Sequence, residues 1–294
     1  TANSYLISAP GHYRIPLVYG NAIKNGSDNQ SAYKTSNTGT YILSTFKDHL
    51  NHDITNPWIE KSNTANANID GAKIVWSDEK DLVTSPTIAH VGGDGYLDFE
   101  VKQSDIKSGN AVVAVTKGGT VVWSWHLWFA PKSALSKIEV TNHQGVKYNF
   151  TEETLGWKPK GEVTTYNAPR TVKVKVEQTI ANGGAKQFTV INITQNNGGK
   201  KEGIATLYQF GRKDAFPGMD ETKLPQGSIN KNAGDNMSIT NGIQHPDFYY
   251  KDGINWNNNY GYYNLWSADN TTTGHNDNSV VKTVYDPCPV GFKM

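Results

Sequence analysis

Aromatic and amide side chains gather in one short segment, Asn255-Trp-Asn-Asn-Asn-Tyr-Gly-Tyr-Tyr-Asn-Leu-Trp266. Flat aromatic rings stack on the apolar faces of sugars, while amides pair with hydroxyl groups. This composition therefore predicts a ligand-binding platform, with glycan as the first ligand class. Its candidate residues are Trp256, Tyr260, Tyr262, Tyr263 and Trp266. A loop-rich domain that buries its own aromatic residues would have the same composition, so both interpretations stay open.

A loop dense in oxygen donors follows, at Asp269-Asn-Thr-Thr-Thr-Gly-His-Asn-Asp-Asn278. Calcium prefers such oxygen ligands, which makes Asp269 and Asp277 candidate calcium ligands. The acidic spacing of an EF-hand is absent, and Asn and Asp are also ordinary turn residues. His49 and His52 could share one side of a helical turn, but no third zinc ligand is identifiable.

The single cysteine, Cys288, lies between two prolines in Val284-Tyr-Asp-Pro-Cys-Pro-Val-Gly-Phe292. Neither a neighbouring base nor a helix start is present to lower its pKa, which argues against a nucleophile. We expect a structural cysteine that forms half of a disulfide. With no second cysteine in the sequence, we expect its partner to lie beyond Met294 in a longer protein.

Two further clusters each allow a structural and a chemical interpretation. Trp123-Ser-Trp-His-Leu-Trp128 is either a sugar platform with a polar edge or packing at a contact of the sandwich domain, and packing is favoured. Arg212-Lys-Asp214 is preferred as an internal ion-pair brace over a catalytic group. A glycosidase needs two facing carboxylates. No motif pairs the available ones, which are Asp214, Asp220, Glu221, Asp247 and Asp252.

Composition narrows the class of protein. The 28 basic residues nearly balance the 27 acidic ones, so no electrostatic argument favours a nucleic-acid partner. No apolar run approaches the roughly 20 residues that span a bilayer, so no membrane span is expected. Abundant Asn, Gly, Thr, Ser and Tyr with sparse charge is typical of a secreted or cell-surface β-protein.

The elements that would position these residues are mostly strands. The clearest hairpin is 111–116 with 120–129, joined by Lys117-Gly-Gly119. Strands spaced about ten residues apart predict a β-sandwich over residues 1–132. A loop-rich domain is expected over 133–294. Alternating valines and charged residues at 170–178, matched by 187–194, predict a β-ribbon inserted at about 168–196.

Several segments together resemble a known group of surface proteins. They are Trp123–Trp128, Thr154-Leu-Gly156, Leu207-Tyr-Gln-Phe-Gly-Arg-Lys-Asp-Ala-Phe216, Gln244-His-Pro246 and Tyr285-Asp-Pro-Cys-Pro-Val-Gly-Phe292. Their order resembles the Fibrobacter succinogenes major paralogous domain group of Bacteroidetes, which has links to fimbrillin-like adhesins. The ribbon at 168–196 departs from that group's pattern.

The resemblance implies a mainly β protein, with an immunoglobulin-like sandwich followed by a partial, α+β lectin-like domain. It implies a cell-surface lipoprotein, outer-membrane anchored in its full-length form, in a gut bacterium. It also implies that the cysteine of a later strand pairs with Cys288. We therefore expect a non-enzymatic protein for adhesion or ligand capture, at a fimbrial tip in one version, with a glycan or another host or bacterial surface molecule as its ligand.

Two alternatives remain. A pilus or surface-assembly subunit would have its sheet edges completed by strands from other fimbrial or surface subunits. A glycan-active hydrolase is the second alternative. No cofactor is expected in any of these cases, apart from calcium.

Overall fold

The computed structural model describes residues 1–163, 169–178, 184–195, 200–252, 255–256, 261–273 and 279–294. It is mainly β, which confirms the predicted fold class. The two α-helices in the described part are short, α1 (Ile59–Ser62) and α2 (Ile239–Gln244). No described helix is long and apolar enough to cross a membrane.

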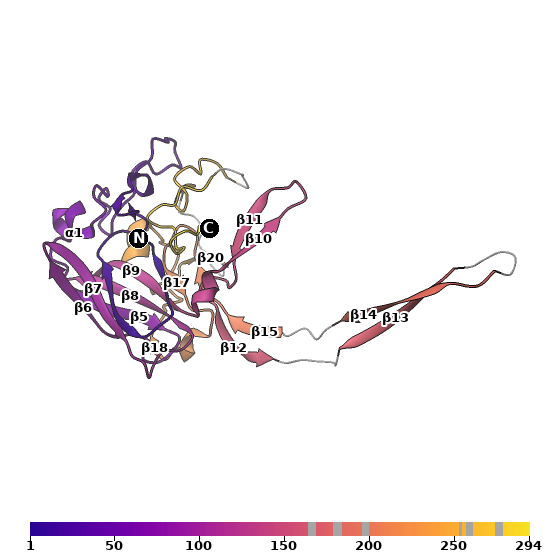
Figure 1. Cartoon of the computed structure of the whole chain (residues 1–294). Coiled ribbons are helices and arrows are strands. Elements are labelled where there is room, and N and C mark those ends of the chain that lie inside the picture. The colour runs from indigo at the N-terminus through magenta and orange to yellow at the C-terminus, as the bar shows by residue number, and fades with distance from the viewer. Residues whose placement is uncertain (164–168, 179–183, 196–199, 253–254, 257–260, 274–278) are drawn as a thin grey trace. The chain divides into compact units, whose positions relative to one another are not determined.

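Two sheets form a sandwich-type arrangement near the N-terminus (Figure 1). The larger has the order β1 (Ser4–Ile7), β9 (Thr120–Phe129), β8 (Gly109–Lys117), β5 (Gly71–Ser77) and β18 (Gln226–Gly227). Only β1 and β9 are parallel among these neighbours. The smaller sheet has the order β2 (Gly11–Pro16), β7 (Asp94–Val101) and β6 (Thr84–Val91), all antiparallel.

Short elements fill the connections. Residues 17–70 contain β3 (Ile23–Lys24), β4 (Ser27–Asp28), η1 (Gln30–Ala32) and η2 (Thr64–Asn66) besides α1. After the sandwich come η3 (Lys132–Leu135) and the hairpin β10 (Lys137–Thr141) with β11 (Lys147–Thr151). The later part has β16 (Leu207–Tyr208), β17 (Ala215–Phe216), η4 (Glu221–Lys223), β19 (Lys251–Asp252) and β20 (Asn255–Trp256).

The inner faces of the two sheets share one hydrophobic core. Leu97 and Phe99 of β7 meet Val113 of β8 and Trp125 of β9 in this core. Alternation along β7 puts every second residue inside, as expected for a strand with one solvated face. Residues from the later part of the chain, such as Tyr285, belong to the same core.

The outer face of the larger sheet is also covered. Trp76, Val112 and Ala114 pack there with Ala215, which lies about a hundred residues further along the chain. Strands β8 and β9 are therefore buried at almost every position. Trp123, Trp125 and Trp128 are at most 1% exposed, so the packing interpretation of this tryptophan strand is confirmed.

Contacts divide the chain into two compact units, residues 1–158 with 204–294, and residues 159–203. The second unit holds β12 (Lys158–Val163), paired with β15 (Lys200–Ile204), and the ribbon of β13 (Arg170–Glu177) with β14 (Phe188–Gln195). The ribbon expected at 168–196 thus falls inside this unit. The domain division into 1–132 and 133–294 stays a prediction, although residues from both sides of it share the main core.

Candidate functional site

The predicted aromatic platform is only partly described. Trp266 is half-buried: its Nε1 donates to the Arg212 carbonyl at 3.1 Å, and its ring meets Phe210 edge-on at 5.2 Å. Tyr263 is also half-buried, with its ring 5.2 Å from that of Tyr41. Both residues anchor their loop to neighbouring segments, which is the alternative that the composition left open.

The other three platform candidates have different settings in the structure. Tyr262 is half-buried and packs against the main core. Trp256 lies in β20, where its backbone pairs with Lys251, and its side chain is outside the described residues. Tyr260 lies outside the described residues altogether.

The calcium candidates are not assembled into a site in the described chain. Asp269 is exposed and accepts a long hydrogen bond from the Asn37 amide at 3.4 Å, while Asp277 lies outside the described residues. No cluster of three or more His, Cys, Asp or Glu residues suited to a metal occurs among the residues that were described. Calcium binding stays a prediction.

Cys288 is a buried free thiol in this chain, 6% exposed. Burial, and then the nearby Asp286 carboxylate, raise its pKa to about 12. A thiol with such a pKa is a poor nucleophile at neutral pH. The disulfide expected at Cys288 stays a prediction.

A buried ion pair joins two of the recognisable motifs. The Lys213 ammonium donates to Asp214 Oδ1 at 2.6 Å and to the Ser124 hydroxyl, and that hydroxyl donates to the same Asp214 oxygen at 2.6 Å. Lys213 also lies 4.7 Å above the Trp123 ring. Burial lowers the pKa of Lys213, and the Asp214 charge opposes that shift. The cluster is an internal brace, as preferred from the sequence.

Arg212 fastens the following loops. Its guanidinium donates to the carbonyls of Phe248, Gly242 and His245 at 2.5, 3.0 and 2.8 Å. It lies 3.6 Å from Asp214 Oδ2 and over the rings of Phe216 and Tyr250. Five donors in a planar fork suit such multiple carbonyl recognition.

His126 lies at the centre of a second buried network. The Asn110 amide donates to Asp78 Oδ2 at 3.0 Å and to the Gly156 carbonyl at 2.9 Å, so its oxygen is left to accept from His126 Nε2 at 2.9 Å. Nδ1 then accepts from the Tyr208 hydroxyl at 2.9 Å. Burial lowers the pKa of His126 to about 3, so the ring is neutral at ordinary pH.

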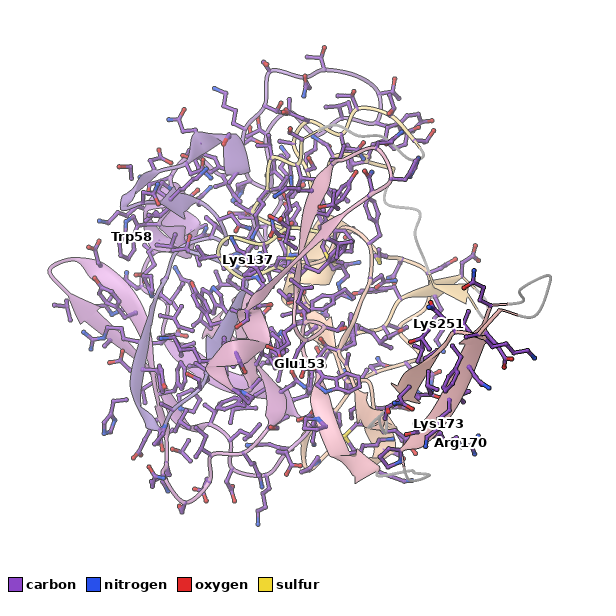
Figure 2. All side chains as sticks on the ribbon, turned by 45° about the vertical axis from the view of Figure 1, so that its right-hand side comes forward. Trp58, Lys137, Glu153, Arg170, Lys173 and Lys251 are labelled. Carbon is purple, nitrogen blue, oxygen red and sulfur yellow. The ribbon has the colours of Figure 1, made fainter. Side chains whose placement is uncertain are left out.

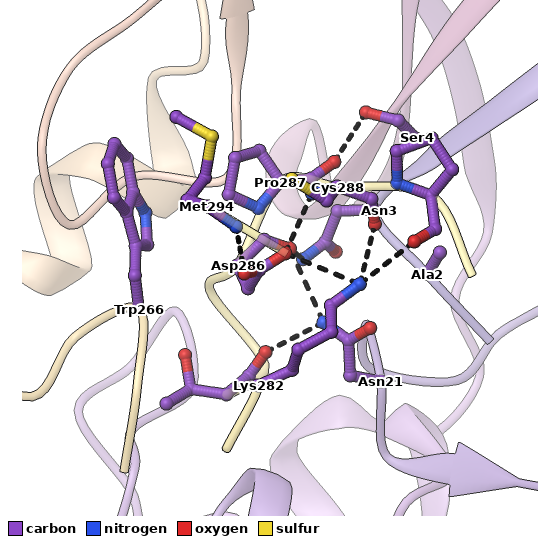
Figure 3. Close-up of polar contacts among 12 residues, drawn as sticks. Ala2, Asn3, Ser4, Asn21, Trp266, Lys282, Asp286, Pro287, Cys288 and Met294 are labelled. Carbon is purple, nitrogen blue, oxygen red and sulfur yellow. Dashed lines mark hydrogen bonds and ion pairs between the residues drawn. The ribbon is translucent and has the colours of Figure 1, made fainter. Parts of the chain in front are cut away.

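Hydrogen bonds hold the segment Tyr285–Pro289 against the N-terminal residues (Figure 3). The Asn3 amide donates to the carbonyls of Val284 and Asp286 at 2.7 and 2.8 Å. The Ser4 hydroxyl donates to the Pro287 carbonyl at 2.6 Å, and the Asn21 amide donates to the Thr283 carbonyl at 2.7 Å. Residues 283–289 are therefore buried against the N-terminal segment.

The best candidate for ligand binding is a pocket of about 360 Å³ on the loop-rich part of the larger unit. We call it the Tyr249 pocket. It is lined by Leu207, Phe216, Pro217, Gly218, Met219, Glu221, Ile229, Lys231, Tyr249 and Lys251. Its volume lies in the range of small-molecule sites, about 300–1,000 Å³, and its lining mixes apolar with polar side chains.

The walls of the Tyr249 pocket are set by the sandwich. β18 adds to the edge of β5, and there Gly227 has φ +75° with the space for its Cβ only 2.1 Å from the Val75 carbonyl oxygen. Ile229, just beyond this contact, packs on the outer face of the larger sheet. The backbone of Tyr249 in turn donates to the Asn230 carbonyl at 2.8 Å.

Four side chains with polar groups also line this pocket. Tyr249 is half-buried, its ring meets Phe216 edge-on at 4.9 Å, and burial raises the pKa of its phenol. Glu221 pairs with Lys231, and this contact lowers the pKa of Glu221. Lys251, labelled in Figure 2, adds a second ammonium group. The pocket therefore offers an aromatic ring, a neutral hydroxyl, one carboxylate and two cations.

Sequence reasoning did not single out Tyr249, Phe216 or Lys251 as ligand-binding residues. The aromatic pair Tyr249-Tyr250 is a visible signal, but Tyr250 is buried whereas Tyr249 lines the pocket. Which of two adjacent rings faces outward depends on long-range packing.

Comparison of the chain with models of protein families, with curated proteins and with solved structures gives no match.

Proposed function

We propose that this chain is a non-enzymatic adhesion or ligand-capture protein that binds glycan in the Tyr249 pocket. The observation that carries the proposal is the pocket itself, in which a half-buried tyrosine lies among apolar side chains and three charged ones. A sugar ring presents both an apolar face and hydroxyl groups, so it matches this mixture.

In this proposal the ring of Tyr249 stacks on the sugar, while Lys231, Lys251 and Glu221 bond to its hydroxyl groups. Such a site is weak by itself because few groups contact the ligand. Display of many copies on a surface would raise the overall avidity. A partly preformed pocket favours recognition without folding of a loop, which keeps the entropic cost of binding low.

The carboxylates support capture over hydrolysis. Glu221 is the carboxylate that lines the Tyr249 pocket among the described residues, whereas a glycosidase needs two. Asp214 is 3% exposed and engaged by Lys213, so it is not available to a sugar. His126 is 1% exposed with both ring nitrogens hydrogen-bonded.

We further propose that the sandwich is immunoglobulin-like and that the chain belongs to a cell-surface protein, outer-membrane anchored in its full-length form. Immunoglobulin domains have strands named A to G in chain order, with B-E-D adjacent in one sheet and G-F-C in the other. The orders β2-β7-β6 and β9-β8-β5 match these two sets in space and in chain order, which supports the proposal. The resemblance to fimbrillin-linked surface proteins supports the same setting. The lectin-like assignment of the later residues rests on that resemblance.

The test is binding of the purified chain to a glycan microarray, followed by titration of any bound glycan. Tyr249→Ala should weaken binding at least about tenfold because the stacking surface is lost. Tyr249→Phe keeps the ring and should bind within a few-fold of the wild type. Tyr148→Ala removes an exposed tyrosine of β11 away from the pocket and should leave affinity unchanged.

Failure of the wild-type chain to bind any glycan would refute the proposal. Equal affinity of the wild type and Tyr249→Ala for a bound glycan would place the site elsewhere. A loss of affinity that Tyr148→Ala shares would indicate non-specific binding through exposed tyrosines.

A further inference from the structure

The guanidinium of Arg212 has one N–H group without a partner among the described residues. Its two Nη atoms are matched by four acceptors, which are the carbonyls of Phe248, Gly242 and His245 and, at 3.3 Å, the side-chain oxygen of Gln209. The fifth donor of the guanidinium, Nε–H, is buried and makes no hydrogen bond there. Because buried donors almost always have a partner, this atom calls for an explanation.

A small cavity adjoins Arg212. Its volume is about 10 Å³, and its lining includes Arg212, Lys213 and Asp214 together with Ile239 and Ile243 of α2. The three charged residues are 2–3% exposed, and all of these residues belong to the larger unit. A cavity needs about 10–15 Å³ to hold one water molecule, so this one is just large enough for a single water.

Asp214 supplies an acceptor at the same cavity. Its Oδ1 accepts from the Lys213 ammonium and from the Ser124 hydroxyl, both at 2.6 Å, whereas its Oδ2 accepts no hydrogen bond from the described part of the chain. Arg212 Nη2 is 3.6 Å from Oδ2, which is too far for a direct hydrogen bond. Water commonly bridges polar groups that are separated by such a gap.

We propose that this cavity is a binding site for one internal water molecule. The water accepts a hydrogen bond from Arg212 Nε and donates one to Asp214 Oδ2, so that each group gains the partner that the described chain does not give it. A buried water makes two to four hydrogen bonds, and this arrangement supplies two. The site is separate from the proposed glycan binding and does not depend on it.

The charges around the cavity favour a neutral occupant. An anion would face the Asp214 carboxylate, and a cation would face the Arg212 guanidinium and the Lys213 ammonium. Either ion would therefore meet a like charge in a buried setting, where charges repel strongly. A water molecule can accept on one side and donate on the other, as this pair of a donor and an acceptor requires.

The bridging water connects two of the polar clusters described above. Asp214 belongs to the brace with Lys213 and Ser124 of β9, while Arg212 holds the backbone at residues 242–248. The water adds a contact between these two clusters. It therefore helps to hold the segment that leads to Tyr249 against the larger sheet.

The test uses the three arginines of the chain, Arg14, Arg170 and Arg212. The deuterated full chain, labelled with heavy nitrogen in arginine alone, gives one Nε–Hε signal for each of them. Arg14→Lys and Arg170→Lys assign these signals and leave the cavity intact. The Hε of Arg212 should show an NOE to water that is opposite in sign to the corresponding ROE, which marks a water held inside the protein.

Arg14 is the matched control in the same spectrum. Its Nε donates to Asp98 Oδ1 at 2.7 Å in an exposed ion pair, so its Hε should lack the signal of a long-held water. An Arg212 Hε without that signal would overturn the proposal. The same signal at Arg14 would also count against it, because the measurement would then report surface hydration.

A high-resolution crystal structure supplies a second measurement that needs no variant. Density for one water should lie about 2.5–3.2 Å from both Arg212 Nε and Asp214 Oδ2. Bromide soaked into the same crystals should give no anomalous signal in the cavity. An empty cavity, a bromide signal in it, or a direct hydrogen bond from Nε to Oδ2 would each overturn the proposal.

Discussion

Burial decides what His126 can do. The residue type suggests acid–base chemistry, yet the imidazole is enclosed and bonded to Asn110 and Tyr208. The same holds for Lys213 and Asp214, which would be reactive groups in an open site and are a brace inside this one. At the scale of single residues, the sequence supplies chemical identity, and long-range packing decides whether that chemistry is available.

The neutral state of His126 leads to a prediction for stability against pH. The pKa of His126 is about 3 in the folded chain and near 6.5 for the exposed ring, so as pH falls the unfolded state takes up a proton before the folded state does. The contribution of the neutral His126 ring to the free energy of unfolding is fully present above pH 6.5. It is lost as pH falls toward 3, by about 1.4 kcal/mol per pH unit.

Urea unfolding of the wild type and of His126→Gln, followed from pH 7.5 to pH 4.5, measures this contribution. Glutamine keeps a donor for Asn110 but cannot take up a proton. The difference in free energy of unfolding between the two proteins should therefore shrink as pH falls. A difference that stays constant over this range would show that His126 does not titrate on unfolding.

Elements with a clear pattern were predictable. The β8–β9 hairpin follows from two runs of β-forming residues around Lys117-Gly-Gly119, and the β13–β14 ribbon follows from alternation of valine with charge. β18 was not predictable because two residues carry no periodicity, and its pairing with β5 depends on Trp76 and Ile229 packing on the same face of the sheet. The Tyr249 pocket was not predicted either, because its position also depends on contacts between segments that are far apart in the sequence.

Gly227 tests how tightly β18 is held. An alanine there would have a left-handed backbone and would also meet the Val75 carbonyl oxygen at 2.1 Å. Gly234 has a similar φ of +80°, and a Cβ there would meet only Asn236 Oδ1 at an ordinary 4.0 Å, so Gly234→Ala isolates the backbone strain. Strain alone costs about 1–2 kcal/mol, and overpacking adds about 1–3 kcal/mol.

Thermal unfolding of both variants should show Gly227→Ala as the less stable protein by that second amount. Gly227→Ala should also weaken ligand binding, since Ile229 and Lys231 would shift with the strand. Equal melting temperatures for the two variants would mean that β18 does not lie against β5 as described.

Within the larger unit, hydrogen bonds join segments that are far apart in the sequence and hold them in place. Asn3 accepts from Trp123 Nε1 at 3.2 Å while its amide holds Val284 and Asp286. Lys282 donates to the carbonyls of Cys288 and Pro289. Of the segments that carry the resemblance, Trp123–Trp128 and Tyr285–Pro289 are therefore parts of one buried framework. A glycan specificity would have to come from the loops around it.

Cys288 can report on this lock. Asn3→Ala with Asn21→Ala removes the amides that hold residues 283–286 and should let this segment open more often. The rate of Cys288 alkylation under native conditions should then rise at least about tenfold over the wild type. Asn142→Ala, in the exposed β10–β11 turn, is the matched control and should leave the rate unchanged. An unchanged rate in the double variant would mean that the carbonyl contacts do not hold the segment closed.

The contact between Ser4 and Pro287 also has a consequence for the order in which the chain folds. Some 283 residues separate the two partners, so the first strand cannot reach its final surroundings until nearly the whole described chain has been synthesised. At about 5–20 residues per second, that wait is on the order of 15–60 s. Once β9 has been synthesised, this tryptophan strand lacks part of its cover for the rest of that time, and the growing chain is exposed to aggregation. A chaperone that shields β-strands, or transport of the unfolded chain before closure, would protect it in that interval.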